Sequence, residues 1–394
     1  MAQPWGTAAR SDSKGHSVRI VGRDEPIYVA PNPQAKRRGA LQAHARLPIY
    51  AATAGPGCAG DWLMVGPLAW VCSERTEPSA APPAPAVLSP PAIADGLPYR
   101  YHFVGQDGSF GYRDLATAEM GTPDVQIEPG FVVAIRRTKE RFRGDPFGLT
   151  TKGYWVPVRD LVPIREFGFA GEQLGGTRRV GWVYTSTADA FAKPGGRRTQ
   201  HATLSQFAAV DVVETQEHGR HSWYRIAEDR WMSDQQLRVA SPAPMPADLL
   251  PNERWIDIDL DHQVLTAFAG ERPVFATLVS SGRGREGTEQ ATPKGEFRIW
   301  VKLSSSDMDN LEHEEANRFY AIQDVPWVMY FSRGYGLHGT FWHRSFGRVR
   351  SHGCVNLAPL DAQWLFHWTS PRLPTGWSAV LPTEYDPGTL VRVR

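Results

Sequence analysis

The stretch GLHGTFWHRSFGRVRSHGCVN, residues 336–356, decides which fold and chemistry this chain can have. It contains one cysteine, Cys354, and among its histidines His338 and His352 are the two available to that cysteine. A cysteine attacks as its thiolate, and a free thiol with a pKa of about 8.5 needs a basic neighbour at neutral pH. An imidazole with a pKa of about 6.5 can take that proton and return it to a leaving group. The stretch therefore indicates acyl transfer by a cysteine and a histidine.

The same residues allow a simpler interpretation. A lone cysteine is more often a small buried apolar residue than a nucleophile. Gly353 favours the catalytic alternative, because a residue without a Cβ lets backbone N–H groups approach an oxyanion beside Cys354. On these residues alone, both alternatives stay open.

The pattern H-G-T … S-H-G-C-V-N resembles the signature of the L,D-transpeptidases, which carry a YkuD-type catalytic domain. Residues 292–297, TPKGEF, match the TPxGxF segment of that family, and residues 325–331 also follow the family pattern. The resemblance covers about residues 252–383. It implies a mainly β protein whose C-terminal catalytic domain is β-sandwich-like.

The resemblance implies a role for each matching residue. Cys354 is expected to be the nucleophile, His338 the general base and acid, and Gly339 the residue whose carbonyl orients the imidazole. The expected pocket residues are His352, Ser351, Gly353 and Asn356, with the amides of Gly353 and Cys354 as oxyanion donors and a structural hydrogen bond from Ser351.

Three further residues, Tyr320, Trp327 and Arg350, are expected to contact substrate. Arg350 can hold a carboxylate through two parallel hydrogen bonds, or it can form an ordinary surface salt bridge. Tyr320 belongs to an acidic stretch between Lys302 and Pro326, where the family has a lid over the cysteine, and is expected to line the donor channel. A run of acids is equally typical of a solvated loop, so both interpretations stay open.

The family acts on peptidoglycan stem peptides. The cysteine attacks the carbonyl at the L-centre of meso-diaminopimelate, D-alanine leaves, and an amine of a second stem resolves the thioester into a 3→3 cross-link. Water, a D-amino acid or a lipoprotein lysine as acceptor gives carboxypeptidase, exchange or anchoring activity instead. Neither a metal nor an organic cofactor is expected, and carbapenems acylate the cysteine in this family. A wall-binding protein with an inactive domain is the non-enzymatic alternative.

The overall composition excludes some classes of partner. The chain of 394 residues has 43 basic and 42 acidic side chains, so it offers no strong field for nucleic acid or anionic lipid. No stretch approaches the roughly 18 consecutive apolar residues that a membrane-spanning helix needs. The N-terminus shows no apolar leader segment. The resemblance nevertheless implies export to the periplasm or cell envelope, with a leader removed, and we expect a monomer.

Tryptophans recur through the first part of the chain, and the intervals from Trp70 to Trp155 to Trp231 each suit one small domain. The WYRI…RWM…L ending of the third unit resembles a bacterial SH3-like (SH3b) domain. The expected units are an SH3-like β module at 17–75, a Pro/Ala-rich linker or surface loop at 76–95, a second small β module at 96–170, an SH3b-like module at 176–241 and the catalytic domain at 252–383. Most of the tryptophans are expected in small cores, and a few could contact a glycan or peptide.

Local patterns add three expectations. Cys58 and Cys72 lie in one small β unit and can either form a disulfide or remain two buried thiols. The alternation at Ile256, Ile258 and Leu260 predicts a β-hairpin that turns at residues 261–262. A helix is expected at residues 359–368.

Overall fold

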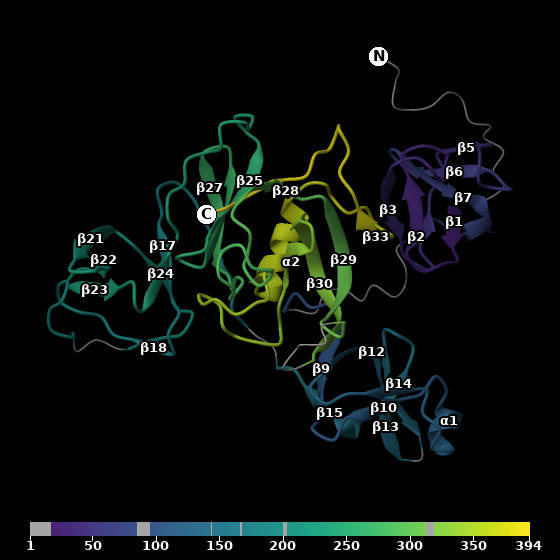
Figure 1. The fold of residues 1–394 in the computed structure, drawn as a ribbon, viewed down its shortest axis with the longest axis horizontal. Helices are drawn as coiled ribbons and strands as arrows, with labels where there is room; N and C mark the ends of the chain where they lie inside the picture. The colour runs from purple at the N-terminus through teal and green to yellow at the C-terminus, as the bar shows by residue number, and fades with distance from the viewer. Residues whose placement is uncertain (1–16, 85–94, 143, 166–167, 200–202, 313–318) are drawn as a thin grey trace. The chain divides into compact units, whose positions relative to one another are not determined.

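The computed structural model describes residues 17–84, 95–142, 144–165, 168–199, 203–312 and 319–394. The chain is mainly β, as expected (Figure 1). It divides into two compact units. Unit 1 comprises the described part of Met1–Glu166 with Val301–Val328 and Phe366–Pro387; unit 2 comprises the described part of Phe167–Trp300 with Met329–Leu365 and Gly388–Arg394. Over the part of the chain that is described, no helix is both long and apolar enough to cross a membrane.

The first module of unit 1 is built from short antiparallel strands. They are β1 (Ser17–Ile20), β2 (Glu25–Tyr28), β3 (Arg37–Leu41), β4 (Arg46–Leu47), β5 (Ala51–Thr53), β6 (Trp62–Gly66), β7 (Ala69–Cys72), the 3-10 turn η1 (Ser73–Arg75) and β8 (Thr76–Ser79). β8 pairs with β1, from Ser17 opposite Ser79 to Ile20 opposite Thr76. The linker expected from residue 76 therefore begins with a paired strand of this module, and residues 85–94 lie outside the described residues.

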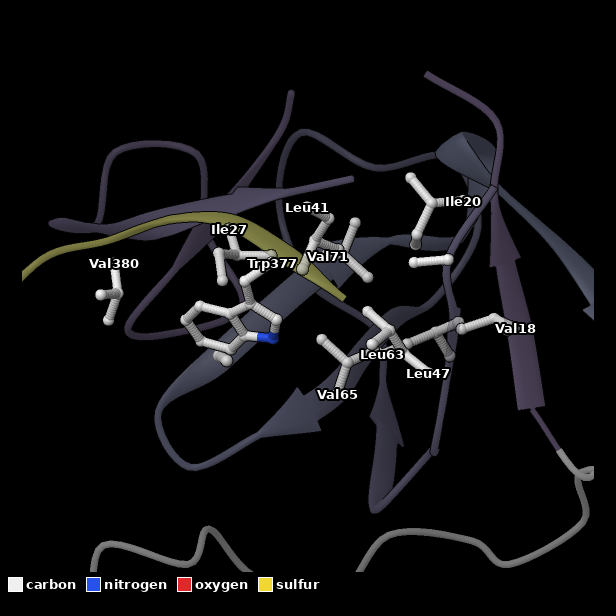
Figure 2. Packing of buried hydrophobic residues seen from close by; sticks show 12 residues of the cluster. Val18, Ile20, Ile27, Leu41, Leu47, Leu63, Val65, Val71, Trp377 and Val380 are labelled. Carbon is white, nitrogen blue, oxygen red and sulfur yellow. The ribbon is translucent and has the colours of Figure 1, made fainter. Parts of the chain in front are cut away.

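A strand from the C-terminal part of the chain completes this module. β33 (Trp377–Val380) pairs with β3, so that Gly39 lies opposite Val380. A Cβ on Gly39 would collide with the carbonyl oxygen of Ala379, so this position requires glycine. Figure 2 shows the yellow strand crossing the module with the indole of Trp377 among its aliphatic side chains. Residues 17–75 therefore do not enclose their core without β33.

A disulfide joins Cys58 to Cys72, with 5.6 Å between their Cα atoms. Of the two alternatives that the sequence left open, the structure has the bridge. The amide of Ala59, the residue after Cys58, donates a hydrogen bond of 3.0 Å to the side chain of Glu74. The bridge and this bond tie the loop before β6 to the turn after β7.

The second module of unit 1 contains most of the remaining strands of that unit. Its elements are β9 (Arg100–Val104), β10 (Ser109–Gly111), α1 (Leu115–Glu119), β11 (Val125–Ile127), β12 (Val132–Phe142), β13 (Asp145–Thr150), β14 (Trp155–Pro157), the 3-10 turn η2 (Val158–Asp160) and β15 (Leu161–Pro163). β12 pairs with β9 and β13, and Val133, Ile135 and Val156 lie in a common core.

The third module belongs to unit 2. Its strands are β17 (Val180–Val183), β18 (Thr187–Ala188), β19 (Leu204–Ser205), β20 (Ala209–Asp211), β21 (Glu214–His218), β22 (His221–Ala227), β23 (Arg230–Ser233) and β24 (Leu237–Val239). Trp231 lies in β23, which is followed by a three-residue turn and then by β24. Trp70 and Trp155 likewise lie in a strand followed by a three-residue turn and another strand. The sequence repeat therefore corresponds to a repeat in local structure. The SH3-like nature of the modules stays a prediction.

Unit 2 contains a six-stranded sheet. Its order is β16 (Glu172–Gln173), β27 (Arg272–Leu278), β26 (Val264–Ala269), β25 (Arg254–Asp259), β34 (Leu390–Val393) and β28 (Gly295–Arg298). β25 and β26 are the expected hairpin. β34 runs parallel to β25, and Arg392 and Arg394 each bind the buried carboxylate of Asp257, at 2.7 and 2.9 Å. This strand lies beyond residue 383, where the catalytic domain was expected to end.

The remaining elements are β29 (Val301–Asp309), β30 (Ala321–Ser332), β31 (Tyr335–Gly339), β32 (Val355–Leu357) and α2 (Pro359–Trp368). The helix expected at 359–368 is confirmed. Both arms of the acidic stretch are strands, and the Asn310 side chain accepts the Tyr320 amide at 2.7 Å where they meet. Residues 313–318 of the expected lid lie outside the described residues.

The third module shares a core with the six-stranded sheet. Phe346 has no exposed surface, and its ring centroid lies 6.0 Å from that of Phe169. It packs in one cluster with Trp182 and Leu278. The next residue, Gly347, has a φ of +86°, and its carbonyl accepts a hydrogen bond from Arg238 of β24. The segment leading to the cysteine is therefore held by the third module.

Asp361, in the first turn of α2, makes stability depend on pH. Burial raises its pKa to about 7, although it accepts hydrogen bonds from Thr277 and Gly171. Its unfolded pKa is about 3.9, so the folded state binds the proton more tightly and stability falls as pH rises from about 4 to about 7. We expect Asp361→Asn to remove this fall. The melting temperature of the variant, relative to that of the native chain, should therefore increase from pH 5 to pH 8.

Melting curves at each pH test this, with Asp261→Asn as the control because Asp261 is exposed. Parallel pH profiles for the native chain and Asp361→Asn would show that Asp361 ionises normally in the folded protein.

Candidate active site

Cys354 and His338 are carried by two neighbouring parallel strands. His338 lies in β31 opposite Asn356 of β32, and Cys354 immediately precedes β32. Continuing that register places Cys354 level with Gly336, two residues before His338. Side chains two residues apart in a strand share a face of the sheet. The register therefore directs Cys354 and His338 to one face, while Leu337 and Val355 are fully buried on the other.

His338 is held as a neutral base. Its Nδ1 lies 3.4 Å from the carbonyl oxygen of Gly339 and 3.3 Å from the hydroxyl of Thr340. Burial lowers its pKa to about 4, and the hydrogen bond to the Gly339 carbonyl opposes that shift. Because Nδ1 donates its proton to this carbonyl, Nε2 keeps its lone pair. This is the protonation state that a general base requires.

Cys354 is a partly exposed free thiol. Burial raises its pKa above the usual value, and a hydrogen bond from the Gly336 amide partly lowers it again. Its sulfur lies 3.6 Å from the carbonyl oxygen of Gly334. The pKa of the Cys354 thiol is raised and the pKa of the His338 imidazole is lowered, so both groups are neutral near pH 7. The two shifts therefore do not favour a thiolate–imidazolium ion pair in the resting protein.

The turn before Cys354 is fixed by Ser351 and Gly353. The Ser351 hydroxyl accepts the Gly353 amide at 3.0 Å and donates to the Cys354 carbonyl. Gly353 has a φ of +127°, and a Cβ there would stand 2.5 Å from the ring of Tyr335. The expectation that the Gly353 amide is an oxyanion donor is therefore corrected, because Ser351 already binds it. The Cys354 amide remains the candidate donor.

Thr292 holds the same turn from outside the motif. Its hydroxyl donates to the Gly353 carbonyl at 2.7 Å and accepts the Gly282 amide at 2.9 Å. Its exposed fraction is 5%, so water does not replace these bonds. Sequence reasoning matched Thr292 to a family segment but assigned it no role. Its contact with the cysteine turn explains why a hydroxyl residue stands there.

We expect Thr292→Val to loosen the cysteine turn. It leaves the Gly282 amide and the Gly353 carbonyl unsatisfied in a buried place, at about 1–3 kcal/mol for each group. The unfolding free energy should fall by an amount of this size, and the rate of acylation of the Cys354 thiol should fall as well. Denaturant titration and acylation rates measure both, with Thr288→Val as the control because its hydroxyl bonds an exposed loop carbonyl. Equal effects in the two variants would contradict this role.

The contacts of His352 and Arg350 differ from those of His338. Arg283 donates to Nε2 of the exposed His352 at 2.7 Å, which occupies the lone pair that a base would need. His338 is therefore the base candidate of the two histidines. Arg350 is exposed, and among the described residues no carboxylate forms a salt bridge with it. It stays a predicted substrate contact.

Asn356 is buried and bonded in two directions. Its backbone exchanges two hydrogen bonds of 3.0 Å with Ser280, and its side-chain amide lies 2.8 Å from Nε2 of His343. Burial and the nearby Arg350 lower the pKa of His343 to about 3. Sequence reasoning gave His343 no role, although it stands inside the quoted stretch. Its position between two motifs was the available signal.

The two other predicted substrate residues belong to unit 1. The indole N–H of Trp327 donates to the Gly96 carbonyl at 2.6 Å, and its ring packs against Phe366. Trp327 is only partly buried, and its substrate contact stays a prediction beside this packing role. Tyr320 is partly buried, immediately before β30, and keeps its predicted role as a channel residue.

Among the described residues, Cys58, Cys72 and Glu74 are the one group of side chains close enough together to share a metal ion. The two sulfurs are bonded to each other, so they are not thiolate ligands in this structure.

Residues 253–393 match the family model described as the YkuD L,D-transpeptidase catalytic domain. This segment is an L,D-transpeptidase catalytic domain. The match ends at residue 393, the last residue of β34, which accounts for the strand that sequence reasoning left out. The domain therefore combines strands on both sides of the cysteine with the final strand of the chain.

Known proteins are similar to this L,D-transpeptidase domain. YqjB of Bacillus subtilis (strain 168), named as a candidate L,D-transpeptidase, is 24% identical over 132 residues, which are 31% of this chain and 70% of that protein. An L,D-transpeptidase structure from Stackebrandtia nassauensis is 24% identical with a TM-score of 0.27, covering 39% of this chain and 60% of that one. The catalytic domain of the E. faecium L,D-transpeptidase is 23% identical with a TM-score of 0.27, covering 36% and 98%. The chain thus spans less than two thirds of the Stackebrandtia protein.

Proposed function

We propose that this chain is an L,D-transpeptidase that acts on peptidoglycan tetrapeptide stems through a thioester on Cys354. The observation that carries the proposal is His338, a buried neutral imidazole whose Nδ1 is bound to the Gly339 carbonyl on the strand next to the cysteine. This arrangement leaves Nε2 to take the thiol proton.

The reaction then runs in two balanced steps. Cys354 sulfur bonds to the donor carbonyl as its proton passes to Nε2 of His338, and the Cys354 amide donates to the oxyanion. His338 returns the proton to the nitrogen of the leaving D-alanine as the amide bond breaks. An amine of a second stem then attacks the thioester and gives its proton to His338, and the thiol is restored. The product is a 3→3 cross-link.

Location and partners follow from this substrate. A chain that cross-links peptidoglycan works in the periplasm or cell envelope, and its partners are stem peptides. We propose that the third module braces the catalytic segment, because Phe346 and Gly347 pack against it. Exposed surfaces of the modules are the proposed contacts for glycan or peptide.

Product analysis tests this function. We incubate the full chain with a disaccharide-tetrapeptide and analyse products by mass spectrometry, with and without a second stem. Release of D-alanine together with a 3→3 dimer supports the proposal. Tripeptide without dimer would assign L,D-carboxypeptidase activity, and exchange of D-alanine for added D-methionine would assign the exchange reaction. An unchanged tetrapeptide, with folded protein confirmed, would favour a wall-binding role.

Tyr320 provides a further test of the donor channel. We expect Tyr320→Ala to raise the KM for tetrapeptide about 10-fold or more while kcat changes less, because a contact made equally to substrate and transition state affects binding alone. Steady-state kinetics of D-alanine release measure this. The control is Tyr385→Ala, whose ring is 68% exposed. Unchanged kinetics in Tyr320→Ala would remove this residue from the channel.

A further inference from the structure

The segment between the two sequence motifs contains a histidine, His343, with three defined neighbours. The ring of His343 accepts the amide of Ser345 at Nδ1, 3.1 Å away, and its Nε2 lies 2.8 Å from the side-chain Nδ2 of Asn356. The ring also packs against Phe346, with 5.5 Å between centroids. Phe346 lies fully buried in the core shared with the third module. The imidazole of His343 is therefore anchored on three sides.

The protonation of this ring follows from its contacts. A neutral imidazole has one N–H and one lone pair, and Nδ1 must offer its lone pair to the Ser345 amide. The proton therefore stands on Nε2. The opposite tautomer would direct the Nδ1 proton at the Ser345 N–H, which is repulsive. Arg350 and His338 both lie near the ring and disfavour a second proton on it.

This assignment fixes the orientation of Asn356. The structure places Nδ2 of Asn356 2.8 Å from Nε2 of His343. Because Nε2 carries a proton, two donors would face each other there, so we assign the amide the other way round, with the acceptor Oδ1 facing Nε2. The two atoms of a side-chain amide are distinguished by such networks and not by their positions alone. The Nδ2 group, with two hydrogens, then turns away from His343. Asn356 lies opposite His338 in the strand register, on the face that carries the proposed reaction.

We propose that His343 is a positioning residue, which holds the Oδ1 of Asn356 so that Nδ2 donates hydrogen bonds to the acyl group on Cys354. The inference rests on the proposed acyl transfer. Without His343 the Asn356 amide is free to flip and offers the acyl oxygen a repelling Oδ1. A preorganised donor costs no reorientation as charge develops, and its complete removal typically costs about 10²–10³ in rate. A freely flipping donor costs less than that.

Three replacements of His343 separate its two hydrogen bonds. In His343→Gln the side-chain nitrogen takes the place of Nε2 and keeps the donor toward Asn356. In His343→Asn the side-chain oxygen takes the place of Nδ1 and keeps only the acceptor toward Ser345. His343→Leu keeps volume and removes both. We expect the single-turnover rate of acylation to fall about 10-fold or more in the Asn and Leu variants, and the Gln variant to restore it to within a few-fold.

A double-mutant cycle distinguishes positioning from a merely structural role. We expect His343→Leu to slow acylation in the native background and to have no further effect in the Asn356→Ala background. Equal losses in both backgrounds, or a Gln variant as slow as the Leu variant, would overturn the proposal. Melting temperatures of all variants show whether a loss of rate follows a loss of fold.

The tautomer itself is measurable without activity. Long-range ¹H–¹⁵N spectra of the full chain should show the His343 ring protonated at Nε2 and bare at Nδ1 from pH 5 to pH 8. A proton at Nδ1 would overturn the inference. A chain that shows the Nε2 proton but converts no tetrapeptide and forms no acyl adduct would instead refute the proposed function, so the two failures are distinct.

Discussion

A single carbapenem adduct should form on the native chain and none on Cys354→Ala. The carbapenem carbonyl takes the place of the donor carbonyl, and Cys354 is the free thiol that the described residues contain, since Cys58 and Cys72 are bonded to each other. His338 can accept its proton, so the native chain should be acylated. Removing the sulfur removes the nucleophile, and the rate should fall at least about 10³-fold.

Intact-mass spectrometry after incubation with the carbapenem measures this. The control is Thr288→Val, a change in an exposed loop that should acylate like the native chain. An adduct on Cys354→Ala would place the reactive group elsewhere. A native chain that is folded and stays unmodified would contradict an activated nucleophile at Cys354.

Trp377→Ala should lower the unfolding free energy of unit 1 by about 3–5 kcal/mol, the usual loss for a large aromatic side chain removed from a core. Trp377 is 2% exposed and belongs to the core cluster of the first module, together with Ile27 and Leu41 (Figure 2). Within that cluster Trp377 packs against aliphatic side chains, which are too small to fill the cavity that alanine leaves. We also expect faster amide exchange in β3, because β33 pairs with it.

Calorimetry and hydrogen exchange of the full chain measure the two effects. Trp300→Ala is the matched control, since this indole is 46% exposed and belongs to unit 2. Its loss should stay within about 1 kcal/mol. A loss in Trp377→Ala no greater than in the control, with unchanged exchange in β3, would show that the first module forms without β33.

Much of the local structure could be predicted from local patterns. Alternating apolar residues predicted the hairpin of β25 and β26, and the helix at 359–368 lies where expected. The recurring tryptophans predicted repeated β units. These predictions succeeded because periodicity and turn residues act over a few positions. The spacer was placed too early because Thr76–Ser79, rich in polar residues, becomes a strand only by pairing with β1.

The sequence by itself determined the family and the candidate nucleophile and base, because the motif keeps the chemically active residues within one short stretch. The tertiary structure alone decided which partners these residues have. Ser351 binds the Gly353 amide, Thr292 holds the Gly353 carbonyl, and Asn356 meets His343. The structure also inserted β33 into the first module, far from it in sequence. Such contacts depend on backbone geometry and on surfaces buried from water between distant segments, and no local pattern of residues encodes them.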